Sequence, residues 1–268
     1  MQLMDFQDLS DTKSLSTFSI KLNPSFALHL SQQNNTQNHG TTVWDSAKLL
    51  AFYLFDTIKK PTFKENKVQN NKTCLELGSG CGLGGLIMAS LGFETVLTDL
   101  PEVVDRVLQP NCATAIDAIT DWWYHLQHTT QSIDPPKITV QSLDWLQLMD
   151  QENQQHSPQT YHYIIASDCI YEIELVEPLL NCIRYYASPS TMIFIAMERR
   201  DDTVVDGFIN KAKAFGFEAR MILKKLLNSK SVGNEDVEIW KLKLRKSRIS
   251  NNVMLNDKSV NSKHHVCV

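Results

Sequence analysis

The sequence lacks a long apolar run and an excess of basic residues, and each absence excludes a class of protein. No stretch approaches the roughly 18 consecutive apolar residues of a membrane-spanning helix. With 26 Lys and Arg against 30 Asp and Glu, the formal net charge is −4, so no broad basic surface is available for nucleic acid. We therefore expect neither membrane insertion nor nucleic-acid binding.

The sequence also lacks paired cysteines. Its six cysteines form no C-x-x-C pair, and several fall inside predicted strands or helices. This pattern is typical of reduced thiols in a cytosolic protein and predicts no metal site. The first residues carry no basic stretch of the kind that begins a secretory signal. We expect a cytoplasmic protein, with the nucleus as a second location.

Glycine is scarce, with 10 residues in 268, yet five of them fall between residues 78 and 85. A short apolar strand precedes these glycines, and apolar residues at helical spacing follow them. Gly92 then stands where a helix C-cap belongs, and a second strand over 96–98 ends at Asp99. This order of strand, glycine turn, helix, strand and acid predicts one half of a doubly wound nucleotide-binding fold.

The residues around the glycines indicate the charge of the ligand. Asp99 lies 21 residues past Gly78, where a carboxylate can accept hydrogen bonds from ribose hydroxyls. The glycines also match the dinucleotide pattern G-x-G-x-x-G over 80–85, which is a weak signal by itself. Glu76 precedes the first glycine by two residues, where it would repel a pyrophosphate and attract a cation. A sulfonium cofactor therefore fits better than NAD, and a dehydrogenase is the least expected function.

Four stretches carry a family resemblance, which covers roughly residues 40–245. Leu-Glu-Leu-Gly-Ser-Gly-Cys-Gly at 75–82 resembles the first motif of seven-β-strand S-adenosylmethionine methyltransferases. Thr42–Asp45, Leu143–Trp145 and Ser167–Tyr171 narrow the resemblance to the methyltransferase-16 superfamily of protein-lysine methyltransferases, in particular the methyltransferase-like 21 group. The resemblance implies a Rossmann-like α/β fold with a seven-stranded, mostly parallel sheet whose last strand is antiparallel. It also implies S-adenosyl-L-methionine as cofactor and a lysine of a chaperone, a translation factor or an AAA ATPase as target.

The chain divides into three parts. Residues 1–40 form an N-terminal extension, in which alternation over 18–22 and 26–30 predicts a β-hairpin followed by a polar loop. Residues 41–245 form the methyltransferase domain, and 246–268 read as a disordered polar tail. We expect a monomer.

Within the domain, the pattern predicts alternating strands and helices. Asp45 or Ser46 can cap the helix over 47–58. A short helix from Leu100 ends near Pro110, and a further helical run over 113–128 carries three aromatic residues. These aromatics either form a substrate-facing lip or pack on the sheet. The strands after the first two are expected at 138–141, 161–167, 191–197, 218–223 and 237–244.

Two tryptophans are candidate walls of the cofactor site. Trp145 follows the third strand, where adenine would sit in this fold, and offers a flat apolar surface worth ~1–2 kcal/mol. Trp44 is either a core residue or, as the resemblance implies, a second wall. The full set of expected cofactor-binding residues is Trp44, Glu76, Gly78, Ser79, Gly80, Asp99, Trp145 and Ser167.

Asp168 and Tyr171 are the candidate catalytic residues, because they follow the central apolar strand. Asp168 could instead cap a helix. A lysine amine has a pKa near 10.4, so its deprotonation at pH 7 costs roughly 4.6 kcal/mol. A carboxylate raises that pKa, and we therefore assign Asp168 to capturing and aiming the ammonium rather than to removing its proton. Tyr171 walls the channel or hydrogen-bonds the amine.

Three interpretations remain open at the sequence level. Glu198–Arg200 either contacts substrate or forms a surface ion pair. The chain could methylate a small molecule or a nucleic acid instead of a protein lysine. It could also be a binding module that retains cofactor affinity without turnover.

Overall fold

The computed structural model describes residues 9, 12–34, 39–61, 63–64, 67–68, 72–127, 133–148, 159–227 and 232–245. The predicted polar tail over 246–268 lies outside these residues. None of the helices within these ranges is long and apolar enough to cross a membrane.

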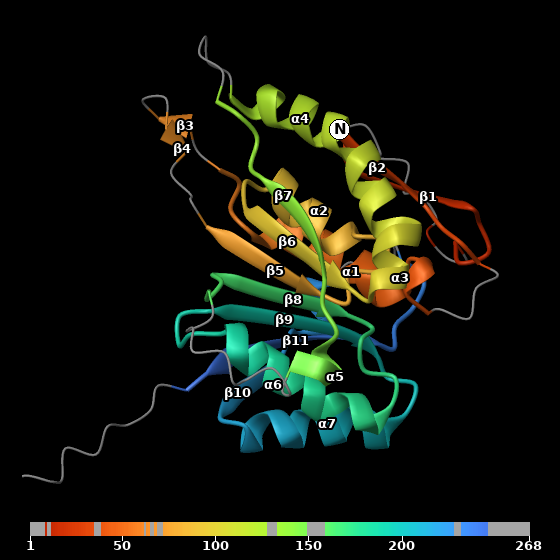
Figure 1. The fold of residues 1–268 in the computed structure, drawn as a ribbon, viewed down its shortest axis with the longest axis vertical. Helices are drawn as coiled ribbons and strands as arrows, with labels where there is room; N and C mark the ends of the chain where they lie inside the picture. The colour runs from red at the N-terminus through yellow and green to blue at the C-terminus, as the bar shows by residue number, and fades with distance from the viewer. Residues whose placement is uncertain are drawn as a thin grey trace, which may run out of the picture.

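A seven-stranded sheet forms the centre of the domain, in the order β10-β11-β9-β8-β5-β6-β7 (Figure 1). Only β11 runs antiparallel to its neighbours in this sheet, while the pairs formed by β5, β6, β7, β8 and β9 with one another are parallel. This arrangement confirms the predicted fold class. The strand bounds are β5 Thr73–Leu77, β6 Glu94–Asp99, β7 Ile138–Ser142, β8 Tyr163–Ser167, β9 Met192–Glu198, β10 Phe217–Met221 and β11 Val237–Leu244.

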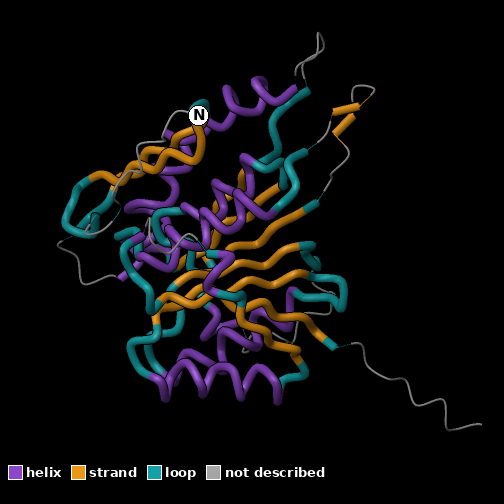
Figure 2. The backbone as a smooth tube through the Cα atoms, turned by 180° about the vertical axis from the view of Figure 1, so that it is seen from behind, coloured by secondary structure: helices purple, strands orange, loops and turns teal. Residues whose placement is uncertain are grey.

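Helices cover both faces of this sheet, because the central strands carry apolar residues on both sides. On β8, for example, Ile165 packs with the helices of one face and Ile164 with those of the other. Figure 2 shows the same layers from behind. The first face is covered by α1 (Asp45–Thr57) and α2 (Leu83–Ser90), and the second by α6 (Val176–Tyr186) and α7 (Asp202–Ala214). Several shorter elements are also present in the described part of the chain. They are the helix α5 (Trp145–Leu148), the 3-10 turns η1 (His39–Thr41), η4 (Ile173–Leu175) and η5 (Lys224–Leu226), and the two-stranded pair β3 (Phe63–Lys64) and β4 (Lys67–Val68).

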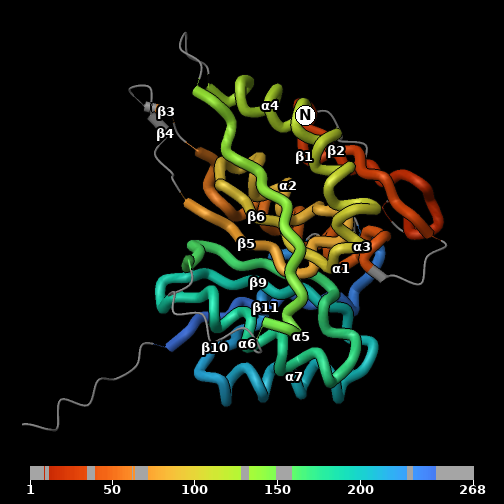
Figure 3. Tube along the Cα trace, viewed as in Figure 1, coloured from red at the N-terminus to blue at the C-terminus, as the bar shows by residue number. Residues whose placement is uncertain are grey.

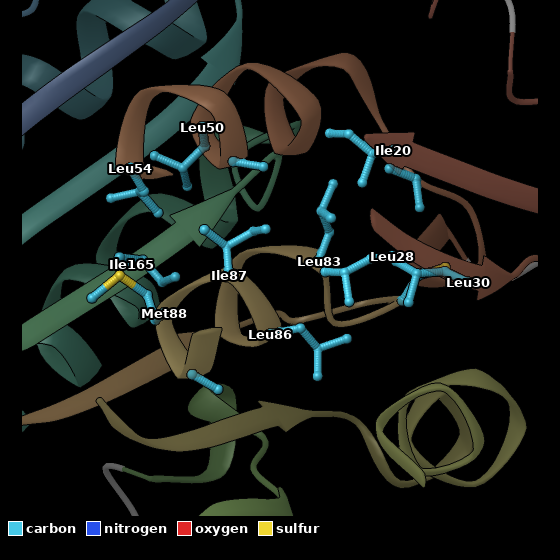
Figure 4. Packing of buried hydrophobic residues seen from close by; sticks show 14 of the residues in the cluster. Ile20, Leu28, Leu30, Leu50, Leu54, Leu83, Leu86, Ile87, Met88 and Ile165 are labelled. Atoms are coloured by element: carbon cyan, nitrogen blue, oxygen red, sulfur yellow. The ribbon is translucent and has the colours of Figure 1, made fainter. Parts of the chain in front are cut away.

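The predicted N-terminal hairpin is present and shares the core of the domain. Strands β1 (Thr17–Asn23) and β2 (Phe26–Ser31) pair antiparallel with Ile20 opposite Leu28. Strand β2 lies beside helix α4 (Gln109–Gln127) (Figure 3). Both side chains are buried and pack toward the first turn of α2, near Leu83 (Figure 4). The hairpin therefore closes one side of the core instead of forming a separate unit.

The helix that follows β6 does not end near Pro110, and this expectation was wrong. Helix α3 (Pro101–Val103), a π-helical segment η2 (Val104–Leu108) and α4 (Gln109–Gln127) follow one another directly. Pro110 has no N–H to donate to the carbonyl of Arg106. The wider π-helical turns precede the proline, and the side-chain amide of Gln33 donates to the Arg106 carbonyl over 3.4 Å. The chain can therefore continue as a helix.

Trp122 and Trp123 of α4 pack inward, which excludes the lip interpretation for them, whereas Tyr124 is exposed. Trp122 stacks on Phe26 of the hairpin with ring centroids 5.2 Å apart, and its Nε1 donates to the carbonyl of Ser90 over 3.1 Å. The Trp123 Nε1 donates to the carbonyl of Ile133 over 2.8 Å. The Trp122 ring thus contacts the hairpin, and its Nε1 the end of α2, rather than the sheet.

Neither Asp45 nor Ser46 caps α1. Trp44 occupies the N-cap position, and no side chain accepts a bond there. The Asp45 carboxylate instead pairs with Lys48 at 2.9 Å and accepts from Asn234. Asp45 thus ties α1 to the loop between β10 and β11.

Glu76 holds the first turn of α2 against the sheet. Its side chain is 2% exposed, and its Oε2 accepts a bond from the Gly85 amide over 2.9 Å. A Cβ at Gly85 would come within 2.8 Å of the same oxygen, so a glycine is required at this close approach. Burial raises the pKa of Glu76 to about 8, although the amide bond to Gly85 acts in the opposite direction.

This buried carboxyl predicts a loss of stability as pH rises. Between about pH 4.5 and 8 the folded chain keeps a proton on Glu76 that the unfolded chain has released, so the free energy of unfolding falls by up to about 1.4 kcal/mol per pH unit. We expect Glu76→Gln to abolish this fall in urea unfolding measured from pH 5 to 8. Glu94→Gln, at an exposed carboxyl, is the control and should follow the wild type. Parallel curves for Glu76→Gln and wild type would contradict the assignment.

Candidate active site

A cavity of about 600 Å³ opens at the carboxyl ends of β5, β6 and β8, where ligands bind in open α/β sheets. Its volume lies within the range of small-molecule sites. Ten residues were expected at the site from the sequence, and all ten line this one cavity: Trp44, Glu76, Gly78, Ser79, Gly80, Asp99, Trp145, Ser167, Asp168 and Tyr171.

The glycine turn after β5 forms the floor of the cavity. Gly78 and Gly80 have φ values of 61° and 54°, which side chains rarely tolerate. A Cβ at Gly80 would also lie 2.9 Å from the carbonyl oxygen of Gly40. Ser79 fixes the turn to β6, because its amide donates to the Thr98 carbonyl over 2.9 Å and its Oγ accepts from the Thr98 amide over 3.0 Å. The turn is therefore a fixed surface in which the backbone is exposed to the cavity at the glycines.

Asp99 faces this turn from the end of β6. Its Oδ2 accepts from the Gly80 amide over 2.7 Å and its Oδ1 from the Leu100 amide over 2.8 Å. Burial raises the pKa of Asp99 above its ordinary value, while these two amide bonds act to lower it. Each oxygen retains a lone pair for a further donor, so the carboxylate can hold hydroxyl groups at a fixed position.

Two tryptophans provide apolar walls. Trp145 stands at the start of α5, and its ring lies 3.1 Å from where a Cβ on Gly78 would be. Trp44 lines the cavity from the N-terminus of α1, which favours the wall interpretation over a core position. Two cations lie over the Trp44 ring, with Lys13 Nζ at 4.8 Å and Arg200 Cζ at 4.9 Å from its centroid.

Asp168 has an unusual backbone. Its φ is 54°, and it is the one non-glycine residue with positive φ in the described part of the chain. Such a conformation costs roughly 1–2 kcal/mol for an ordinary residue and is common at functional sites. The Asp168 amide donates to the Ala196 carbonyl over 2.9 Å, which anchors the turn to β9. The next helical segment begins at Ile173, so the alternative of a helix cap at Asp168 is wrong.

The Asp168 carboxylate is held by an arginine. Its side chain is 5% exposed, and Oδ2 lies 2.7 Å from Nη2 of Arg200. Oδ1 makes a longer contact of 3.5 Å to the amide of Glu198. The guanidinium of Arg200 also binds the Glu198 carboxylate. The sequence did not predict this pair, although it singled out the charged stretch at 198–200.

The stretch at 198–200 was expected either to contact substrate or to form a surface ion pair, and its two arginines differ in this respect. Arg200 lines the cavity, whereas Arg199 pairs with Glu238 at 2.8 Å, Asp202 at 2.9 Å and Asp206 at 3.0 Å. The alternation of side chains where β9 ends sends them in opposite directions. Arg199 is thus an ion-pair residue, and Arg200 belongs to the site.

Tyr171 lies at the mouth of the cavity. It is 48% exposed, and burial of its remaining surface together with the charge of Glu172 raises the pKa of its phenol. Two leucines beside it on the cavity lining, Leu100 at 49% and Leu146 at 55%, are also exposed. Exposed apolar side chains are therefore part of the cavity lining.

Comparison with known proteins identifies the family. The family model described as lysine methyltransferase matches residues 22–215. The EEF1A lysine methyltransferase 3 of Xenopus tropicalis is 28% identical over 173 residues, which cover 62% of this chain and 64% of that protein. The protein-lysine N-methyltransferase rrg1 of Schizosaccharomyces pombe is 28% identical over 203 residues, covering 74% of this chain and 57% of that protein. The chain thus spans less than two thirds of the length of either relative.

Solved structures agree on the fold. The glycopeptide N-methyltransferase MtfA, in its complex with sinefungin, superposes with a TM-score of 0.51 at 10% identity, covering 81% of this chain and all of that one. This likeness supports the fold alone. Because the family model spans most of the chain, from the hairpin to the end of α7, this protein belongs to the lysine methyltransferase family, as the resemblance of its motifs predicted.

Proposed function

We propose that this protein is an S-adenosylmethionine-dependent protein-lysine N-methyltransferase. The observation that carries the proposal is that one cavity joins the glycine turn, the Asp99 carboxylate placed for ribose hydroxyls, and the carboxylate of Asp168. Membership of the lysine methyltransferase family supports the same reaction.

The residues present fit the cofactor. The glycine turn leaves room for close backbone approach, Asp99 presents a fixed acceptor for ribose hydroxyls, and Trp145 offers a flat wall for adenine. Glu76 adds a carboxyl beneath the turn. Trp44 and Ser167 complete the expected contacts. S-adenosyl-L-methionine supplies an electrophilic methyl group on a sulfonium sulfur.

Asp168 orients the target amine. Its buried carboxylate is fixed by Arg200 and by the backbone of β9, so an amine hydrogen-bonded to it has a defined direction. Holding two reactants in a productive geometry is a large part of what a transferase contributes. Tyr171, at the apolar mouth, walls the channel through which the lysine side chain enters.

The substrate is a protein rather than a small molecule. The mouth of the cavity is formed by half-exposed apolar side chains, Leu100, Leu146 and Tyr171, and contiguous exposed apolar surface is typical of contacts with other proteins. Similarity to an EEF1A lysine methyltransferase makes a translation elongation factor the first target to test, with chaperones and AAA ATPases next. The proposal includes a monomer that binds no nucleic acid and acts in the cytoplasm, with the nucleus as a second location.

Replacing Asp168 tests the catalytic role. We expect Asp168→Asn to lower methyl transfer by about 100-fold, because an asparagine whose oxygen accepts from Arg200 presents its NH2 group, a donor, to the amine. Asparagine tolerates positive φ better than alanine, so this variant separates loss of the carboxylate from strain in the backbone. The measurement is tritium incorporation from labelled S-adenosylmethionine into proteins of a cell extract. Asp121→Asn, which changes an exposed carboxylate on α4, should retain wild-type labelling.

The same assay distinguishes the alternatives. A discrete protein band that disappears with Asp168→Asn supports the proposal. Label in RNA or in small metabolites would contradict the protein substrate. Cofactor binding without label in any fraction would indicate a binding module.

Replacing Trp145 tests the cofactor wall. We expect Trp145→Ala to raise the dissociation constant for S-adenosylmethionine about 10-fold, because roughly 1–2 kcal/mol of apolar contact is lost. Trp145→Phe keeps a flat ring and should lose much less. The measurement is isothermal titration calorimetry. Unchanged affinity in the alanine variant would place the adenine elsewhere.

A further inference from the structure

The cavity has an unbalanced charge. Its described lining residues include four with a carboxyl group but only one with a cationic side chain, Arg200. Neighbouring negative charge favours the protonated form of an amine, and a protonated amine has no lone pair for methyl transfer. A lysine reacting in this cavity therefore needs a positive charge close to the carboxylate that orients it. The four acids are Glu76, Asp99, Asp144 and Asp168.

The other titratable groups on the lining supply no such charge. Burial raises the pKa of the Cys81 thiol to about 12, and it raises the pKa of Cys169 and of Tyr171 as well. All three are therefore neutral near pH 7. Burial also raises the pKa of Glu76 to about 8, so this acid is mostly neutral there too.

The charged groups just behind the lining are already paired. Asp45, at the start of α1, binds Lys48 at 2.9 Å and Lys13 at 3.3 Å. Glu198, at the end of β9, binds Arg200. Among the described residues, Arg200 is thus the cation in contact with Asp168.

Arg200 is fixed in place from three sides. Its Nη2 binds Asp168 Oδ2 at 2.7 Å, its Nε binds the Glu198 carboxylate at 2.8 Å, and its Cζ lies 4.9 Å from the centroid of the Trp44 ring. Planar stacking and forked hydrogen bonding are properties of arginine that lysine lacks. The same contacts leave Asp168 Oδ1 with one long bond of 3.5 Å, to the Glu198 amide. That oxygen can accept a further donor.

We propose that Arg200 is a positioning residue whose charge, shared with Glu198, offsets the charge of Asp168, so that the target lysine binds Oδ1 as an uncharged amine with its lone pair free to react. The inference rests on the proposed function. In the transfer, the amine nitrogen forms the new bond to the methyl carbon, the carbon–sulfur bond breaks with its electron pair passing to sulfur, and the surplus proton leaves nitrogen for solvent. Asp168 thereby orients the amine without holding it in its protonated, unreactive form.

The test is the pH dependence of kcat for Arg200→Gln, because kcat reports the pKa of the lysine amine in the bound complex. With the compensating charge removed, the amine is protonated to higher pH, so the acidic limb of the profile should move upward by about one pH unit. Activity at pH 7 should fall about 10-fold and recover as pH rises above the shifted limb. The probe is heat-inactivated cell extract, with tritium incorporation into the labelled protein band measured at extract concentrations where the rate no longer rises with added extract. A loss of folding stability alone would lower the whole profile without moving its limb.

Two further variants complete the design. Arg200→Lys keeps the charge but loses the stacking and the forked hydrogen bonds, so its limb should lie between the limbs of the wild type and of Arg200→Gln. Arg199→Gln removes the same charge from the adjacent residue, which pairs with Glu238, Asp202 and Asp206 outside the cavity, and should leave the limb unmoved. Thermal melting of each variant establishes that it is folded.

Each alternative outcome is distinct. An unshifted limb in Arg200→Gln would overturn the proposal. So would a lower KM with an unshifted limb, since Arg200 would then be competing with the substrate for Asp168. If Arg200→Gln does not fold, Glu198→Gln serves instead: removing this negative charge should move the limb downward, and an unmoved limb would overturn the proposal. Failure of the wild type to label any protein would contradict the proposed function itself.

Discussion

The site depends on the parallel arrangement of the three central strands. Because β5, β6 and β8 run in the same direction, the residues that follow them meet at one edge of the sheet. The glycine turn after β5, Asp99 after β6 and Asp168 after β8 are far apart in the sequence, yet they line one cavity. The pairing of the strands therefore brings together site residues from separate segments of the chain.

Electrostatics imposes the second constraint. A cavity that receives a cationic cofactor and a lysine benefits from carboxyl groups, but the same groups keep the lysine protonated. The fold gives each of three carboxyl groups a fixed partner: the Gly85 amide for Glu76, the Gly80 amide for Asp99, and Arg200 for Asp168. Two of these partners are uncharged backbone amides, and the partner of Asp168 is a cation.

Most of the fold and the positions of the candidate residues could be predicted from the sequence. The glycine turn, the alternating apolar strands and the acid after each strand are local patterns, and local patterns define which elements form. The continuation of the helix through Pro110 could not be predicted, because it depends on a π-helical segment and on Gln33, a residue distant in the chain. The inward packing of Trp122 likewise requires the hairpin residue Phe26.

The sequence identified the stretch at 198–200 but not the roles of its arginines. Arg199 and Arg200 are chemically identical neighbours, and only the strand geometry decides that one reaches Asp168 and the other the acids of α7 and β11. The positive φ of Asp168 could not be predicted either, because aspartate adopts positive φ more often than most residues but still does so at few positions. Contacts between side chains that are distant in the sequence are thus the part of the site that the sequence did not predict.

The most direct test of the central claim is to identify the atom that receives the methyl group. The protein is incubated with S-adenosylmethionine carrying a trideuterated methyl group and a cell extract, and the labelled peptides are sequenced by mass spectrometry. We expect the heavy methyl group on the side-chain nitrogen of lysine at one or a few positions of a specific protein. Heavy methyl groups found only on nucleic acid, on small metabolites or on a residue other than lysine would contradict it.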